Sequence, residues 1–364
     1  MKSRNSVFEI LRIASMLLII AWHYATTFSH VSGGVLATGL SGYHVFAILL
    51  GSWGQLGVDL FIIIGIYFMS KCNQFRSKKA VSLVFETAFY AIFWYIISWY
   101  GFQIQVGKGE LIRQIFGVFM GTHWFITAYL LLYIFHPILN CIIDKLNKKQ
   151  IQQVTILLTV FVSIYKTIYS RAPVCDFLFF VNIYFIINCI EKTDFKRIIN
   201  NSGSLALLTF VSLTSINLLI LIIGQFINSD LVKEHSIYLN HRGSIFVLMV
   251  AIFIFYAIKG LHHIESRTIN IIASTSLGVY LSHQGISQNV WKALFIDDTL
   301  SGINACLHMT FSVIVIFVCC VLIDLIRQYT FEILLVKILD CKRISFVLSW
   351  VDNFINVNEP QLKK

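Results

Sequence analysis

The sequence predicts an all-α fold, a polytopic integral membrane bundle of about ten transmembrane helices with both termini in the cytoplasm. The first observation is composition: 57% of the 364 residues are hydrophobic and only 13% are charged, whereas a soluble domain carries about 25% charged residues. The second is length, because the apolar runs match helices that cross a bilayer and exceed the ~10-residue alternating strands of a membrane barrel. The third is the uneven distribution of basic residues between successive loops.

The apolar runs that we expect to cross the membrane are spread over most of the chain. They lie at about 10–28, 46–69, 81–101, 116–138, 152–170, 174–190, 204–227, 243–260, 268–286 and 303–326. With a cytoplasmic N-terminus, the inner segments hold 20 of the 28 Lys and Arg residues and the outer face holds seven. Because Lys and Arg collect in cytoplasmic loops, this split favours an even number of spans and a multi-pass protein of the cell membrane in that orientation.

The same topology accounts for the net charge of +10. We therefore expect membrane lipids, and no nucleic acid, among the partners. Residues 1–327 are expected to form one transmembrane domain, and residues 328–364 a basic amphipathic tail on the cytoplasmic surface. The eight cysteines are scattered without a Cys-x-x-Cys pair, so neither a zinc site nor a disulfide framework is indicated, and no metal is expected.

The first span carries two ionisable side chains, Arg12 and His23. Eleven residues at ~100° each make about three full turns, so both side chains lie on one helix face, ~16 Å apart along the axis. Ionisable groups within a membrane are costly and mark functional sites by default. Arg12 lies near one membrane surface, and His23 lies near mid-membrane.

Asp59 in the second span is expected at nearly the same depth as His23. A carboxylate that accepts a hydrogen bond from an imidazole fixes the ring and raises its basicity, as beside a general base. Asp59 can equally cap a broken helix or pair with Arg12, and the sequence leaves these interpretations open.

Three further groups of polar residues are candidates for binding. The basic loop after the second span contains Arg76, Lys78 and Lys79 and can bind an anion or simply set the topology. His123 and Trp124 lie near the outer end of the fourth span, where they form either an interface anchor or a stacking platform for a sugar ring. His283 either lines an outer vestibule or lies on a polar helix face whose groups are all hydrogen-bonded within the protein.

Four elements in order carry a resemblance to a known family. They are Arg12 with His23, the run Gly-Val-Asp-Leu-Phe at 57–61 followed by Gly65 and Tyr67, the run from Trp124 to Pro137 with two tyrosines, and Gly-Val-Tyr-Leu-Ser-His at 278–283. Together they resemble membrane-bound acyltransferase family 3, multispan O-acyltransferases that act on cell-surface glycans. One position departs from the pattern, because Ile64 stands where the family has a serine before glycine.

The resemblance implies a donor, an acceptor and roles for the candidate residues. The donor is an acyl-coenzyme A, most often acetyl-coenzyme A, and the acceptor is a hydroxyl of a polysaccharide glycan or of its lipid-linked sugar precursor. Arg12 then contacts a donor phosphate, with further phosphates on the basic loop, and His23 is the general base supported by Asp59. His123, Trp124 and His283 contact the acceptor. An acyl-enzyme on His23 remains a variant of this mechanism.

Two other classes of function are compatible with the sequence. A transporter or exporter of a glycan or lipid-linked intermediate would use Arg12, Asp59 and His23 as a proton or substrate path, although no internal repeat supports it. A sensory membrane domain would use the same fold to bind a ligand, but no soluble output domain is visible.

Overall fold

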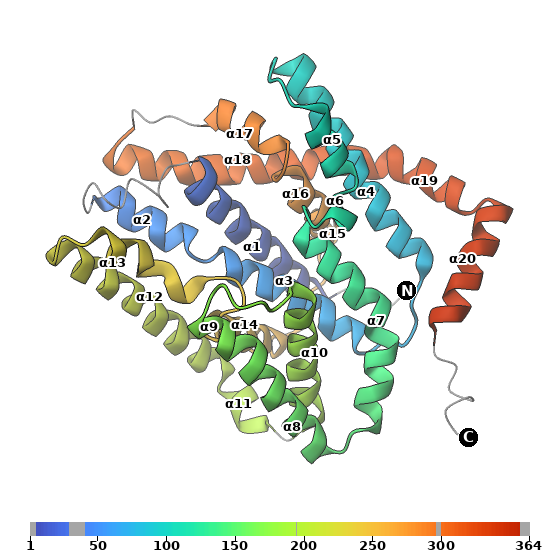
Figure 1. Cartoon of the computed structure of the whole chain (residues 1–364), viewed down its shortest axis with the longest axis horizontal. Helices are drawn as coiled ribbons and strands as arrows, with labels where there is room; N and C mark the ends of the chain where they lie inside the picture. The colour runs from blue at the N-terminus through green and yellow to red at the C-terminus, as the bar shows by residue number, and fades with distance from the viewer. Residues whose placement is uncertain (1–4, 29–40, 194, 296–299, 357–364) are drawn as a thin grey trace. The chain divides into compact units, whose positions relative to one another are not determined.

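The structure is a computed structural model that describes residues 5–28, 41–193, 195–295 and 300–356. Within those ranges, helices are the regular secondary structure, as predicted (Figure 1). The α-helices are α1 (Ser6–His23), α2 (Gly42–Gly51), α3 (Gly54–Met69), α4 (Ser77–Ile96), α5 (Lys108–Ile115), α6 (Gly117–Met120), α7 (Trp124–Lys145), α8 (Lys148–Leu158), α9 (Tyr165–Ile168), α10 (Asp176–Lys192), α11 (Lys196–Asn200), α12 (Ser202–Phe226), α13 (Asp230–Glu234), α14 (Ile245–Lys259), α15 (Arg267–Ser274), α16 (Ser276–Ser282), α17 (Ser287–Phe295), α18 (Gly302–Tyr329), α19 (Phe331–Leu339) and α20 (Lys342–Ile355). Three π-helical segments, η1 (Tyr24–Phe28), η4 (Ile97–Gly101) and η5 (Thr159–Ile164), and one 3₁₀ segment, η6 (His235–Asn240), continue or join them.

Eight helical segments in the described residues are long and apolar enough to cross a membrane, so the chain is a polytopic membrane protein. They are Ser6–Thr26, Gly42–Met69, Ser77–Gly101, Trp124–Lys145, Lys148–Ile168, Ser202–Phe226, Asp230–Lys259 and Gly302–Leu339. Most coincide with predicted spans to within a few residues.

Two predicted spans, 174–190 and 268–286, are not among these eight. The first corresponds to α10, whose 17 residues extend only ~26 Å, somewhat less than the ~30 Å hydrocarbon core. Every α10 residue from Phe179 to Cys189 is buried in protein. The second predicted span is divided at Thr275 into two short helices, α15 and α16.

The chain forms two compact units. The first comprises the described parts of Met1–Ile64, Ser163–Ala172 and Phe195–Val321. The second comprises those of Gly65–Val162, Pro173–Asp194 and Leu322–Lys364. Helices α3 and α18 each contribute to both units.

In the first unit, α1 packs closely against α2 and the start of α3. Glycines recur every third residue there, and a methyl group on any of them would collide with α1. A Cβ on Gly51 would lie 2.3 Å from the Cβ of Ala25, one on Gly54 would lie 2.2 Å from the Cβ of Trp22, and one on Gly57 would lie 2.5 Å from the Ser15 carbonyl oxygen. Close helix packing of this kind fixes the first helical segment on both sides of His23.

In the second unit, polar side chains fix the helix ends. The Asn140 amide nitrogen donates to the Met69 carbonyl at 3.2 Å and to the Asn73 side chain at 2.8 Å, and the Tyr184 hydroxyl donates to the Asn140 side-chain oxygen. These bonds hold the segment after α3 against α7 and α10. The chain is thereby fixed just before the basic loop.

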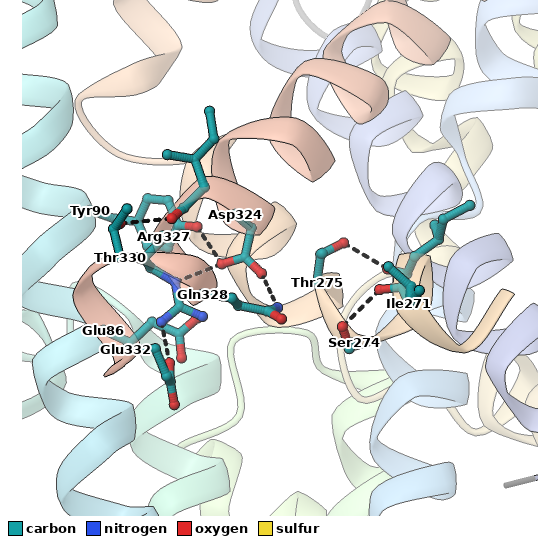
Figure 2. Close-up of polar contacts among 12 residues, drawn as sticks. Glu86, Tyr90, Ile271, Ser274, Thr275, Asp324, Arg327, Gln328, Thr330 and Glu332 are labelled. Carbon is teal, nitrogen blue, oxygen red and sulfur yellow. Dashed lines mark hydrogen bonds and ion pairs between the residues drawn. The ribbon is translucent and has the colours of Figure 1, made fainter. Parts of the chain in front are cut away.

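Arg327 on α18 is the centre of a buried ionic cluster in the same unit (Figure 2). Its guanidinium lies 2.7 Å from Asp324 and 3.0 Å from Glu86 of α4, and it also pairs with Glu332 of α19. Tyr90 donates to Asp324 at 2.6 Å. Through these contacts Asp324, Glu86 and Glu332 join α4, α18 and α19.

Candidate active site

His23 is the last residue of α1, at the point where the α-helix passes into the π-helical turn η1. Such turns are frequent at functional sites because they break the regular spacing of side chains along a helix. His23 is partly exposed, whereas its neighbours Ala21 and Tyr24 are buried. The Tyr24 hydroxyl lies 2.9 Å from Nδ1 of His308.

The side-chain partner of His23 is Gln284. Nε2 of the Gln284 amide lies 2.7 Å from Nε2 of His23. An amide nitrogen can only donate, so Nε2 of His23 accepts, and a neutral ring then carries its proton on Nδ1. The ring of His283 is also close, with 5.2 Å between the ring centroids of His23 and His283.

A tight turn between α16 and α17 brings Gln284 and His283 to α1. Gly285 has a φ of +70°, a conformation that costs glycine little because it lacks a Cβ. The Ser287 hydroxyl donates to the Gln284 carbonyl at 2.8 Å, and the Trp291 indole donates to the Ser282 carbonyl at 3.1 Å. The backbone of Gln284 is therefore held on both sides.

His283 is fully buried, and its ring orientation is fixed. Nδ1 lies 2.6 Å from the Val279 carbonyl oxygen, which can only accept, so Nδ1 is the protonated nitrogen. Nε2 has no hydrogen-bond partner among the described residues. An unpartnered acceptor is thus buried beside the His23 ring.

Asp59 is fully buried, and its hydrogen-bond partner is not His23. The Gln55 amide donates to its Oδ1 at 2.6 Å, and within the described residues Oδ2 has no partner. Gln55 lies one turn earlier in α3, so this contact is local.

Arg12 pairs with Glu9, one turn earlier in α1, with 3.1 Å between Nη1 and Oε2. The Glu9 side chain is only 5% exposed and the Arg12 side chain is 22% exposed. The guanidinium has five N–H donors and a planar fork, so donors remain for an anion. Arg12 and His23 both lie in α1, which keeps the predicted axial separation of ~16 Å.

The basic loop is described within the second unit. Arg76 and Lys79 are exposed, and Lys79 lies 5.0 Å from the centroid of the Tyr133 ring. Lys78 forms an ion pair with Asp340 at 2.7 Å. The Asp352 carboxylate accepts from the Ser77 backbone N–H at 2.6 Å and so caps the start of α4.

His123 and Trp124 also lie in the second unit, at the start of α7. His123 is buried and packs so closely on Gly117 that a Cβ there would lie 2.3 Å from the His123 ring. Trp124 is partly exposed and contacts Phe125 and Phe180 edge-on or tilted.

The structure thus brings together two of the predicted site residues, His23 and His283, and adds two that sequence reasoning missed. Glu9 had a signal, since it precedes Arg12 by three residues on the same helix face. Gln284 had only its position next to His283. In the part of the chain that the structure describes, no three His, Cys, Asp or Glu side chains form a group that could hold a metal ion.

Comparison with known proteins identifies one family. Residues 5–325 match a family model described as an acyltransferase domain, so the match spans α1 to most of α18 and includes His23, Gln284 and Arg12. No curated protein and no solved structure matches the chain.

Proposed function

This chain belongs to the acyltransferase 3 family and is a membrane acyltransferase, and on that premise we propose that it is an O-acyltransferase of surface glycans. The donor in this proposal is acetyl-coenzyme A or another acyl-coenzyme A. The acceptor is a hydroxyl of a cell-surface or exopolysaccharide glycan or of its lipid-linked precursor.

The observation that carries the proposal is the state of His23. His23 is a partly exposed residue at a helix end, and the hydrogen bond that its Nε2 accepts from Gln284 keeps this nitrogen unprotonated, so its lone pair can serve as the base once the acceptor hydroxyl replaces that bond. Such an imidazole can take a proton from an acceptor hydroxyl. The hydroxyl oxygen attacks the thioester carbonyl carbon, the C–S bond breaks, and the proton passes from His23 to the coenzyme A thiolate.

Arg12 is proposed to hold the phosphate end of the donor. An arginine suits a phosphate because its N–H groups form a planar fork and its charge persists at every working pH. The partial exposure of its side chain supports access for an anion. Its axial separation of ~16 Å from His23 suits a donor whose long flexible arm separates its phosphates from its thioester.

The remaining predicted roles rest on the sequence. The hydrogen bond of Asp59 goes to Gln55. Any support that Asp59 gives to His23 is therefore proposed to be indirect, through its buried carboxyl group and not through a hydrogen bond. Arg76, Lys78 and Lys79 are proposed to contact donor phosphates. His123, Trp124 and His283 are proposed to contact the acceptor, and the unpartnered Nε2 of His283 supports this for one sugar hydroxyl.

The membrane arrangement is also a proposal in its details. We infer ten spans with both termini cytoplasmic, α10 and the α15–α16 pair being the two additional ones. The amphipathic tail is supported by α20, where Phe346, Trp350 and Phe354 recur every four residues and are 64–78% exposed. Such a stripe suits the boundary between headgroups and acyl chains. Residues 357–364 of the predicted tail lie outside the described residues.

The test uses membranes from cells that produce the full chain, with acetyl-coenzyme A as the donor. We expect free thiol release above that of membranes lacking the chain, and His23→Ala should reduce it by about 10²–10⁴-fold, the range of a lost general base. His262→Ala, at an exposed position, is the matched control and should leave the rate unchanged. Full thiol release by His23→Ala would exclude the proposed role, and mass analysis of surface glycans with and without the chain identifies the acceptor.

A further inference from the structure

Gln284 differs from the other groups around His23 in that it contacts the nitrogen that would take the proton. The 2.7 Å contact joins the amide nitrogen to Nε2 of His23. His23 and Gln284 are both partly exposed residues, so the contact is not sealed within the core of the protein. The His283 ring is also close to the His23 ring, at 5.2 Å between centroids, with its own proton fixed on Nδ1 by the Val279 carbonyl.

We propose that Gln284 is a positioning residue for acyl transfer, which holds the His23 ring in the tautomer whose Nε2 is unprotonated and aims that nitrogen at the acceptor hydroxyl. The inference rests on the proposed function, because it assigns Gln284 a role in that same reaction. The Gln284 amide does not react and acts only through His23. When the acceptor binds, its hydroxyl replaces the Gln284 amide as the hydrogen-bond donor to Nε2 of His23.

The local fold explains why this amide can position a ring. A glutamine side chain on a free loop loses rotamer entropy when it makes one hydrogen bond. Here the left-handed Gly285 and the bonds from Ser287 and Trp291 fix the backbone before the side chain is placed. The close packing of Trp22 on Gly54 fixes α1 in the same way. Both ends of the Gln284–His23 contact are therefore pre-organised, as a positioned catalytic group requires.

The choice of a neutral amide also has a chemical consequence. A carboxylate at this position would favour the protonated imidazolium, and the base would then work only at higher pH. An amide N–H favours the neutral ring, because it needs the Nε2 lone pair as its acceptor. Among the described residues, the titratable groups in contact with His23 or with its neighbour Tyr24 are His283 and His308, and neither is a carboxylate. Asp59 is the buried carboxylate of the packed helix α3, and its hydrogen bond goes to Gln55.

Two substitutions separate this role from a structural one. Gln284→Met keeps the length and removes the hydrogen bond, and Gln284→Glu replaces the amide by a carboxylate. Gln288→Met makes the same change one turn later and is the matched control, because the Gln288 side chain makes no hydrogen bond to any residue that the structure describes. Each variant is studied as the full chain in native membranes.

The first readout is the reaction of His23 with diethyl pyrocarbonate, which modifies unprotonated imidazole nitrogens and is quantified by mass spectrometry of the His23 peptide. Gln284→Met should speed this modification several-fold, because Nε2 is uncovered. Gln284→Glu should move its pH dependence up by about one unit, since a nearby opposite charge stabilises the imidazolium. Buried His136 should stay unreactive in every variant, which excludes unfolding as the cause.

The second readout is thiol release from acetyl-coenzyme A. Gln284→Met should lower it about tenfold, and Gln284→Glu should move the acid limb of its pH profile upward, with activity partly recovered above pH 8. If the rate and pH dependence of His23 modification were unchanged in both variants, the proposed hydrogen bond between Gln284 and His23 would be wrong. Full thiol release in Gln284→Met with faster modification would overturn the positioning role. If the unsubstituted chain releases no thiol, the proposed function itself fails, while the modification data still report whether the contact exists.

Discussion

The Arg12 guanidinium and the Glu9 carboxylate form an ion pair within one turn of α1, with 3.1 Å between Nη1 and Oε2. The pair explains how a permanent cation is accommodated in the first span, since an unpaired buried charge is costly. Under the proposed function, a donor phosphate would meet an arginine that Glu9 already holds in place.

Arg12→Gln should therefore have two effects that can be separated. The chain should lose stability by about 2 kcal/mol, less than the roughly 3–5 kcal/mol of a fully buried pair because Arg12 is partly exposed. Its KM for acetyl-coenzyme A should rise. The double variant Glu9→Gln/Arg12→Gln should recover the unfolding temperature, because no unpaired charge remains, without recovering the KM. Recovery of both would show that Arg12 serves only to neutralise Glu9.

Gly57→Ala should disturb the site from a distance. Its Cβ would lie 2.5 Å from the Ser15 carbonyl oxygen, and a backbone atom can only move together with α1. Overpacking of this kind costs about 1–3 kcal/mol, and thiol release should fall because His23 moves with the helix. Gly203→Ala meets nothing within 4 Å and should be neutral or stabilising by up to ~1 kcal/mol. Equal unfolding temperatures for the two variants would contradict the close packing.

Asp352→Ala should loosen α20 from α4. The Asp352 carboxylate accepts from the Ser77 N–H at 2.6 Å, at the positive end of the α4 dipole, an interaction worth about 1–2 kcal/mol. Limited proteolysis should cleave the C-terminal segment faster in this variant. Asp340→Ala removes a partly exposed ion pair with Lys78 instead, and its effect should stay below ~1 kcal/mol. Faster cleavage in Asp340→Ala than in Asp352→Ala would argue against the cap.

Arg327→Met should be the most destabilising of these substitutions. It leaves Asp324 and Glu86 with side chains 1% and 11% exposed and no cation, and breaking a buried pair typically costs about 3–5 kcal/mol. Glu332→Gln removes the most exposed partner of the cluster and should cost far less. Thermal unfolding followed by tryptophan fluorescence compares them, and similar unfolding temperatures would mean that the cluster is not held by Arg327.

Much of the architecture could be predicted because the bilayer constrains the sequence directly. Runs of apolar residues must be helical where no water can satisfy the backbone, so the helices and most of their ends followed from composition. The prediction was less informative for 268–286, where polar residues and a break at Thr275 divide the segment into α15 and α16. Hydropathy does not distinguish one continuous helix from two short helices that meet at a break.

By itself, the sequence determined that Arg12 and His23 share one face of one helix, because helical periodicity is a local property, and its motifs identified the family that residues 5–325 match. Only the tertiary structure decided which groups meet those side chains. His23 lies against Gln284, more than 250 residues later in the chain, and the fully buried Asp59 bonds Gln55. The reason is that a span's depth places a residue along one axis, whereas a hydrogen bond also requires the rotation and packing of both helices. In this chain, the close contacts of Gly54 and Gly57 and the left-handed turn at Gly285 set the rotation and packing of the helices around His23.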